Sequence, residues 1–154
     1  MSMDRDSYCT PRHIARRLPI VDLDPCSNVR SHIKARRSCM LSRGENGLLI
    51  PWTGLSVFCN PPYSNVLPFA RKAWEASMFC FLLNADNSTK WYRKLTEFPV
   101  YKFDFYERIE FEAPPGVDQS DGNDRPQMMI ASPDFYQLIK DSFKGLGEWW
   151  RNYV

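Results

Sequence analysis

Two consecutive prolines follow directly after a short apolar run near the middle of the chain. The run, residues 57–59 (Val-Phe-Cys), has the composition of a buried strand, and residues 60–63 (Asn-Pro-Pro-Tyr) end it. Each proline fixes its own φ and has no N–H to give a strand ladder, and the residue before a proline is kept out of the helical region. The sequence therefore predicts a stiff, extended loop at the carboxyl end of a strand. Open α/β sheets bind their ligands at that end.

This loop presents hydrogen-bond acceptors that its own prolines cannot use. The acceptors are the side-chain oxygen of Asn60 and the carbonyl oxygen of Pro61. Together they can hold the two N–H bonds of an amino group on a planar heterocycle, which leaves the nitrogen lone pair free to act as a nucleophile. Tyr63 can stack on the same heterocycle. We interpret the loop as a site that methylates an exocyclic amine from a sulfonium donor. The alternative is an ordinary turn followed by a core tyrosine.

At this loop the chain resembles amino methyltransferases with an Asn/Asp/Ser-Pro-Pro-Tyr/Phe motif, and it is most similar to the small Dam-like DNA adenine methyltransferases of bacteriophages and prophages. Four further pieces carry the resemblance: residues 9–11 (Cys-Thr-Pro), 22–28 (Asp-Leu-Asp-Pro-Cys-Ser-Asn), 46–48 (Asn-Gly-Leu) with Trp52, and 108–111 (Arg-Ile-Glu-Phe). The resemblance implies that S-adenosylmethionine is the cofactor and that double-stranded DNA with a flipped adenine is the partner. The methyl group would pass to N6 by direct displacement, without a metal. The implied catalytic residues are Asn60, Pro61, Pro62 and Tyr63.

The donor site is expected around the first strand, residues 19–24, with two acids at its carboxyl end. An acid there can bind the cationic amino group of the donor. Methyltransferases usually follow this strand with a glycine-rich turn, but no glycine stands between Met1 and Gly44, so small residues replace it. The resemblance places a Thr-Pro pair against the donor's amino-acid end, and a carboxylate in the loop after the second strand is the candidate for its ribose hydroxyls. The expected cofactor-binding residues are Thr10, Pro11, Asp22, Asp24, Pro25, Cys26, Ser27 and Glu45. The alternative for Asp24 is a turn or helix-cap acid.

The resemblance and the hydrophobic pattern together predict an α/β fold, a trimmed Rossmann-like methyltransferase fold with a mostly parallel sheet, an antiparallel edge and helices on both faces. Expected helices cover residues 11–18, 28–37, 65–78, a short stretch around Trp91, and 133–145. Expected strands cover 19–24, 39–41, 79–84, 100–111 and 127–131, besides 57–59. The interval between Asp24 and Asn60 is too short for the usual third strand. Trp149 and Trp150 are expected to dock onto the core.

No separate target-recognition domain is evident, so loops must contact the DNA. The candidates for these contacts are Ser64, Lys90, Trp91, Arg93 and Arg108. For Trp91 a core position is the alternative, and the basic segment 28–37 is more typical of a solvated helix face than of a phosphate-binding one. The sequence leaves the target site unread.

Composition limits the remaining choices. A chain of 154 residues with 44% apolar residues is expected to form a single domain over residues 1–154. The net charge of +2 neither requires nor excludes nucleic-acid binding. Five scattered cysteines without a Cys-x-x-Cys pair favour reduced thiols over a zinc site. With no long apolar stretch and no signal sequence, we expect a monomer in the cytoplasm of a bacterial host.

Two rival functions remain open at this point. The first is an enzyme of the same fold that acts on N4 of cytosine, on RNA or on a protein glutamine, since each presents an amine or amide suited to residues 60–63. The second is a degenerate, non-catalytic module that binds nucleic acid, which the missing glycine turn favours. Donor binding and the identity of the methylated product separate these rivals.

Overall fold

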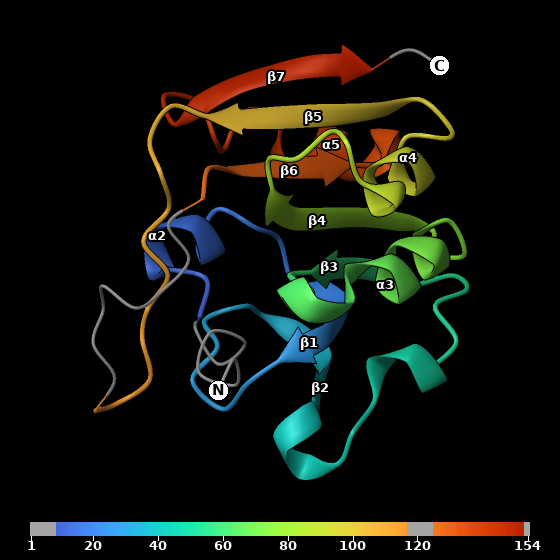
Figure 1. Ribbon diagram of the computed structural model, residues 1–154, viewed down its shortest axis with the longest axis vertical. Helices are drawn as coiled ribbons and strands as arrows, with labels where there is room; N and C mark the ends of the chain where they lie inside the picture. Colours follow the sequence, from blue (N-terminus) through green and yellow to red (C-terminus); the bar gives the residue numbers. More distant parts are fainter. Residues whose placement is uncertain (1–8, 117–124, 153–154) are drawn as a thin grey trace.

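The computed structural model describes residues 9–116 and 125–152, and these form one seven-stranded mixed sheet in the order β2-β1-β3-β4-β6-β5-β7. Four strands run parallel to one another: β1 (Val21–Ser27), β2 (Ala35–Met40), β3 (Ser56–Cys59) and β4 (Met78–Asn84). Three strands extend the sheet in antiparallel pairs: β6 (Gln127–Ala131), β5 (Val100–Phe105) and β7 (Gly147–Asn152). Figure 1 shows the carboxyl ends of β3 and β4 at the same side of the molecule. The predicted α/β fold with an antiparallel edge is confirmed.

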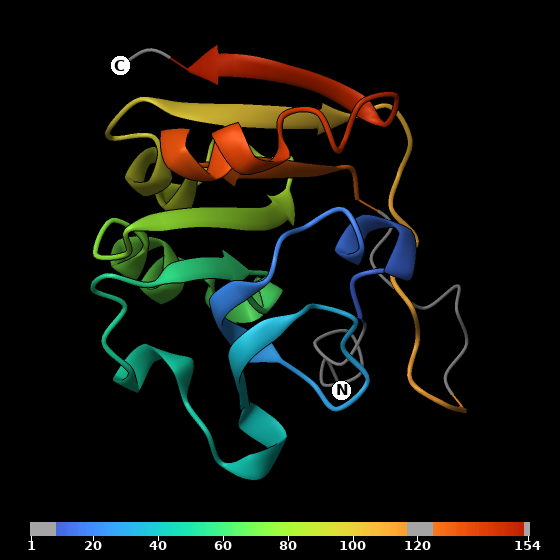
Figure 2. The same cartoon turned by 180° about the vertical axis from the view of Figure 1, so that it is seen from behind.

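Helices cover both faces of the sheet, as predicted. α3 (Val66–Ala73) and α4 (Lys90–Leu95) lie on the face toward the viewer in Figure 1, whereas α2 (Arg12–Ala15) and α5 (Pro133–Ile139) lie on the face seen in Figure 2. Side chains alternate between the faces, so that Val57 joins one core cluster and Phe58 the other. The site at the strand ends is therefore supported by a packed core on each side.

β1 is longer than expected, which corrects the predicted position of its acids. It runs past residue 24 to Ser27, with an irregular register against β2 between Asp24 and Ser27. Pro25 lies in this irregular stretch, where the N–H that proline lacks is not needed for a regular ladder. Asp22 and Asp24 thus lie inside the strand instead of at its end.

The helix expected at residues 28–37 is absent, and this prediction was wrong. Residues 28–34 form an extended strap that returns the chain to the start of β2. An extended residue spans about 3.3–3.6 Å but a helical residue rises only ~1.5 Å, so a helix in this short connection could not return along β1. Local turns also compete with helix formation, since the side chain of Asn28 accepts from the Arg30 N–H and that of Ser31 from the Ile33 N–H.

No strand lies beyond β2 in the described residues, as expected for a sheet without the usual third strand. In its place are two short 3-10 turns, η1 (Leu41–Arg43) and η2 (Gly47–Leu49). A third, η3 (Tyr63–Asn65), leads into α3.

Several other boundaries differ from the predictions. α2 and α5 end earlier than expected, α3 ends at Ala73, and the strand expected over 100–111 ends at Phe105. The sequence analysis also missed β7, which pairs with β5 along the sheet edge. Within β7, Trp149 packs against Phe103 as expected, but Trp150 is exposed. The described helices include none long and apolar enough to cross a membrane.

Candidate active site

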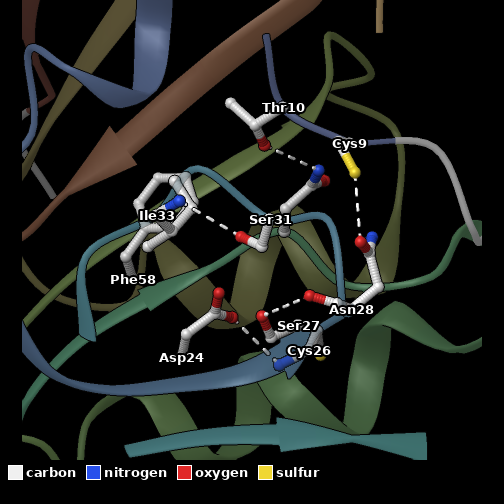
Figure 3. Close-up of a pocket in the computed structure, with 10 residues that line it drawn as sticks. Cys9, Thr10, Asp24, Cys26, Ser27, Asn28, Ser31, Ile33 and Phe58 are labelled. Atoms are coloured by element: carbon white, nitrogen blue, oxygen red, sulfur yellow. Dashed lines mark hydrogen bonds between the residues drawn. The ribbon is translucent and has the colours of Figure 1, made fainter. Parts of the chain in front are cut away.

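A hollow of about 260 Å³, partly open to solvent, lies at the carboxyl ends of β1 and β3. We call it the Asp24 hollow. Among its lining residues are Thr10, Asp24, Cys26, Ser27 and Asn60, which the sequence analysis assigned to the site. Figure 3 shows Asp24 at its floor, with Thr10 and the strap residue Ser31 around it. The lining residues that were missed are Cys9, Asn28, Ser31, Ile33 and Phe58. Cys9 and Asn28 stand at the ends of the motifs quoted above. Ser31 and Ile33 were missed because residues 28–37 were expected to form a helix.

Asp24 is a buried carboxylate, only 3% exposed. Its Oδ1 accepts from the backbone N–H of Cys26 at 3.2 Å. Burial raises the pKa of Asp24 to about 6, although hydrogen bonds from Cys26 and Ser27 oppose the rise. Asp24 forms no ion pair with any cationic side chain in the described residues. A buried acid of this kind is best stabilised by a cationic group that enters the hollow from outside the chain.

Asn60 and Thr10 meet across the hollow. The Asn60 Nδ2 donates to Thr10 Oγ1 at 3.3 Å, which turns the Asn60 side-chain oxygen away from Thr10. Pro11 occupies the N-cap position of α2, and the Thr10 side chain is buried at the site. Thr10 therefore contributes to the orientation of the Asn60 amide.

The strap and two other segments wall the Asp24 hollow. Cys9 pairs with Glu112 through two backbone hydrogen bonds of 2.9 Å, and its thiol donates to the Asn28 side chain at 3.1 Å. The Nε2 of His32 on the strap lies within hydrogen-bond distance of the Glu112 carboxylate. Arg30 donates to the carbonyl of Ala113 at 3.0 Å. These contacts fix the strap over the hollow without any regular secondary structure.

A second, larger hollow of about 870 Å³, also partly open to solvent, lies on the other side of the Asn-Pro-Pro-Tyr corner. We call it the Tyr63 hollow. Pro61 and Tyr63 line it, opposite Trp91 at the start of α4. The rest of its wall consists of Val66, Leu82, Leu83, Asn84, Asp86, Thr89 and Arg125. Asn60 lines the Asp24 hollow and the next residue, Pro61, lines the Tyr63 hollow, so the corner separates the two spaces.

Two acids assigned to the cofactor site lie elsewhere. The Asp22 carboxylate accepts from the Ser56 N–H at 2.9 Å and approaches Arg36 Nε at 3.4 Å, so that it links neighbouring strands. Glu45 is exposed, and its side chain accepts from the Met40 N–H at 3.2 Å. Neither residue lines either hollow. Their assignment to the donor site therefore stays a prediction, which the lining of the two hollows does not support.

A glycine from another loop packs against the irregular end of β1. Gly47, in the turn before β3, packs so closely against Pro25 that a Cβ at Gly47 would lie only 2.4 Å from the Pro25 carbonyl oxygen. Only glycine fits there without a shift of the chain. The indole of Trp52 donates to the Gly47 carbonyl at 3.0 Å and holds the loop in place. Pro11 and Pro25 are buried beside the Asp24 hollow but are not among its lining residues.

The residues proposed to contact DNA have two different positions. Trp91 lines the Tyr63 hollow and also packs against the core. Its position therefore fits both the expected place beside the site and the alternative of a core residue. Ser64, Lys90, Arg93 and Arg108 are exposed and line neither hollow. All five cysteines are free thiols, and no group of three or more metal-binding side chains occurs in the part of the chain that the structure describes.

Comparisons with known proteins agree with this geometry. The sequence pattern of the family described as DNA N-6-adenine-methyltransferase (Dam) matches residues 1–144. The DNA N-6-adenine-methyltransferase of Haemophilus phage HP1 (strain HP1c1) is 32% identical over 163 aligned positions, which cover 94% of this chain and 90% of that protein. No solved structure matches the chain. The chain therefore belongs to the Dam family of DNA N-6-adenine-methyltransferases, enzymes that pass a methyl group from a methyl donor to N6 of adenine in DNA.

Proposed function

We propose that this chain binds S-adenosylmethionine in the Asp24 hollow and methylates N6 of an adenine flipped from duplex DNA into the Tyr63 hollow. The observation that carries the proposal is the division of the site by one rigid corner. Asn60 and Pro61 are adjacent in sequence yet line different hollows. A group held between them can therefore face a donor on one side and an acceptor base on the other. The proposed enzyme acts as a monomer.

The Asp24 hollow suits the amino-acid end of the donor. Burial raises the pKa of Asp24 to about 6, and an ammonium group beside it would stabilise the ionised carboxylate. Cys26 and Ser27 are small enough to let a ligand approach the backbone, and Gly47 performs the packing role of the missing glycine turn. When bound, S-adenosylmethionine supplies an electrophilic methyl group on a positively charged sulfur.

The corner suits the amine of adenine. The Asn60 Oδ1, which Thr10 helps to orient, and the Pro61 carbonyl can accept the two N6 hydrogens. As the new C–N bond forms, the bond between the methyl carbon and the sulfonium sulfur breaks, and the sulfur leaves as a neutral thioether. The two oxygens stabilise the positive charge that develops on N6, until one proton leaves to water. Flipping the base costs a few kcal/mol, and stacking on an aromatic side chain such as Tyr63 contributes about 1–3 kcal/mol in return.

The exposed residues around the site can hold the duplex. Ser64 follows Tyr63 directly, and Lys90 and Arg93 lie on α4 beside the Tyr63 hollow. Arg108 lies on the segment that leads to the Glu112 contact of the strap. Contacts from such side chains to phosphates would position the DNA without reading its sequence.

The test is transfer of labelled methyl from S-adenosylmethionine to duplex DNA, followed by digestion and identification of the labelled nucleoside. The expected product is N6-methyladenine. Label in N4-methylcytosine, in RNA or in protein would overturn the assignment of the acceptor. Calorimetry with S-adenosylmethionine alone tests the donor site, because a non-catalytic module would show no binding.

A further inference from the structure

The short helix α2 presents two arginines to solvent beside the site. Thr10, whose hydroxyl accepts from Asn60 at 3.3 Å, stands two positions before the first residue of this helix. That first residue, Arg12, and the C-cap residue, Arg16, are both exposed, whereas the apolar side chains of α2 are buried. Residues four positions apart share one face of a helix. α2 therefore carries two cations on its solvent face, close to the residues that hold Asn60.

These two guanidinium groups have no acidic partner in the part of the chain that the structure describes. Neither Arg12 nor Arg16 takes part in an ion pair there, and α2 has no acid in its first turn. The neighbouring Arg17 is different, because its guanidinium donates to the His13 carbonyl at 2.6 Å. Like charges four residues apart on a helix repel each other. An anion from outside the chain would relieve this repulsion.

The turn that packs against α2 adds to the positive charge. The Ser142 hydroxyl donates to the carbonyl of Arg17 at 2.9 Å, so the turn after α5 lies against the end of α2. Lys140 and Lys144 in this turn are exposed, and Asp141 is the acid between them. Clustered charges of one sign produce a surface potential that attracts an oppositely charged polymer. The surface around α2 thus suits a polyanion.

α2 lies at the strand-end side of the molecule, on the opposite face of the sheet from α3 and α4 (Figures 1 and 2). Three of the DNA-contact candidates named above belong to the face of α3 and α4: Ser64, Lys90 and Arg93. The major groove alone is about 12 Å wide, so the phosphates of a duplex placed over the strand ends reach both faces. Contacts from α2 would therefore meet a part of the duplex that these candidates leave unsupported.

We propose that Arg12 and Arg16 contact phosphates of the substrate DNA, so that the duplex is held from both faces of the sheet. The proposal rests on the function proposed above. Duplex DNA matches this surface because its phosphates are regularly spaced, and because the duplex must be held while the adenine is flipped out. Such contacts fix the orientation of the duplex without reading its sequence.

The test is the salt dependence of binding between the whole protein and a fluorescein-labelled DNA duplex of mixed sequence, measured by fluorescence anisotropy. Each cation that contacts a phosphate contributes about one unit to the slope of log Kd against log salt concentration. Arg12→Gln/Arg16→Gln should therefore flatten the slope by about two units and weaken binding about tenfold or more at low salt. Arg12→Lys/Arg16→Lys keeps both charges and should keep the wild-type slope.

Arg71→Gln provides the matched control. Arg71 is exposed and forms no ion pair among the described residues, and it lies in the last turn of α3, which leads away from the corner toward the start of β4. This variant should keep the wild-type slope. A change there as large as in Arg12→Gln would mean that any lost positive charge has this effect, and would overturn the specific role of α2.

The remaining outcomes separate this inference from the proposed function. An unchanged slope in Arg12→Gln/Arg16→Gln, with a wild type that binds duplex and forms N6-methyladenine, overturns the inference and leaves the proposed function standing. If the wild type forms no N6-methyladenine, the proposed function fails instead. Thermal unfolding verifies that each variant is folded. Arg12→Gln and Arg16→Gln tested singly should each flatten the slope by about one unit, which keeps the test decisive if the double variant does not fold.

Discussion

The two hollows share the Asn60–Pro61 corner as a common wall, yet they are constructed in different ways. The Asp24 hollow is small and polar, and its buried carboxylate lies beneath the strap. Local turns, the contact between His32 and Glu112, and backbone hydrogen bonds hold the strap in place. The Tyr63 hollow is larger, and much of its wall is aliphatic or aromatic, including Leu83 and Trp91. The first construction suits a compact cationic group and the second a flat ring. If the donor and the acceptor base bind as proposed, different physical effects recognise them: charge compensation in the Asp24 hollow and stacking in the Tyr63 hollow.

The hollows also differ in what they contribute to folding. Leu82, Leu83 and Val66 of the Tyr63 hollow belong to the two core clusters, so that wall stabilises the fold. Asp24 does the opposite, because an ionised carboxylate buried without a counter-ion destabilises the folded state. Asp24 therefore lowers the stability of the fold, and the proposed binding of a cationic donor would offset that cost, whereas the apolar wall of the Tyr63 hollow adds to stability.

The largest expected effect lies at the corner itself. Asn60→Ala removes one acceptor that stabilises charge on N6, so kcat should fall by about 10²–10³-fold. Donor affinity, measured by calorimetry, should change by less than about threefold, since Asp24 remains. Asn60→Asp is the matched control, because a carboxylate keeps the acceptor and Thr10 can donate to it. An equal loss of donor binding and turnover in Asn60→Ala would mean that the residue is structural.

The next effect concerns the Asp24 hollow. Asp24→Asn should raise the free energy of unfolding but weaken donor binding. With a folded-state pKa of about 6, above the unfolded value, Asp24 favours the folded state only when protonated. That contribution is present below about pH 4 and is lost as the pH rises through 6. Asp24→Asn should therefore raise the free energy of unfolding by about 3 kcal/mol at pH 7–8 and leave it unchanged at pH 4. Urea unfolding at both pH values measures this.

Donor binding should move the other way in the same variant. Loss of a charge-assisted contact should weaken S-adenosylmethionine binding about tenfold or more at pH 7.5. Wild-type affinity should itself decline as the pH falls below 6, and the affinity of the variant should not. Equal donor affinity in both proteins at pH 7.5 would return Asp24 to a purely structural role.

Substitutions of Tyr63 in the Tyr63 hollow should have a smaller effect, seen in kcat/KM for duplex DNA and not in donor affinity. Tyr63→Ala should lower kcat/KM for duplex DNA by about tenfold, from the ~1–3 kcal/mol that stacking contributes. Tyr63→Phe keeps the ring and should stay within about threefold of the wild type. Donor affinity should not change in either variant. A base unpaired by an opposite mismatch costs less to flip, so it should reduce the deficit of Tyr63→Ala.

The sequence predicted best where local chemistry and tertiary context agree. The strand at β4 and the capped α4 were correct because a continuous apolar run and a Thr89 cap leave little choice. The Asn-Pro-Pro-Tyr loop was placed at a strand end because its prolines allow nothing else. Asp24 and Asn60 were therefore expected at one edge of the sheet, and the structure brings both to one hollow.

The sequence failed where a distant contact decides. The strap at 28–34 has the composition of a basic helix, but the distance back to β2 requires an extended chain. Asp22 and Asp24 look equivalent in sequence, and only their tertiary partners distinguish an acid that links neighbouring strands from an acid that lines the hollow. Gly47 carried no local signal, since its role depends on Pro25 in another strand.

The smallest expected effect is the one that distinguishes these two acids. Asp22→Asn makes the same chemical change as Asp24→Asn, two positions away on the same strand, but the Asp22 carboxylate faces Ser56 and Arg36 instead of the hollow. Donor affinity should change by less than about twofold, because no contact in the Asp24 hollow is altered. Stability should fall by about 1 kcal/mol or less, since an amide oxygen still accepts from the Ser56 N–H while a largely exposed ion pair is lost. Calorimetry and urea unfolding on both variants provide the comparison. If Asp22→Asn weakened donor binding as much as Asp24→Asn, the carboxylates would act together, and the Asp24 hollow would not be the whole of the donor site.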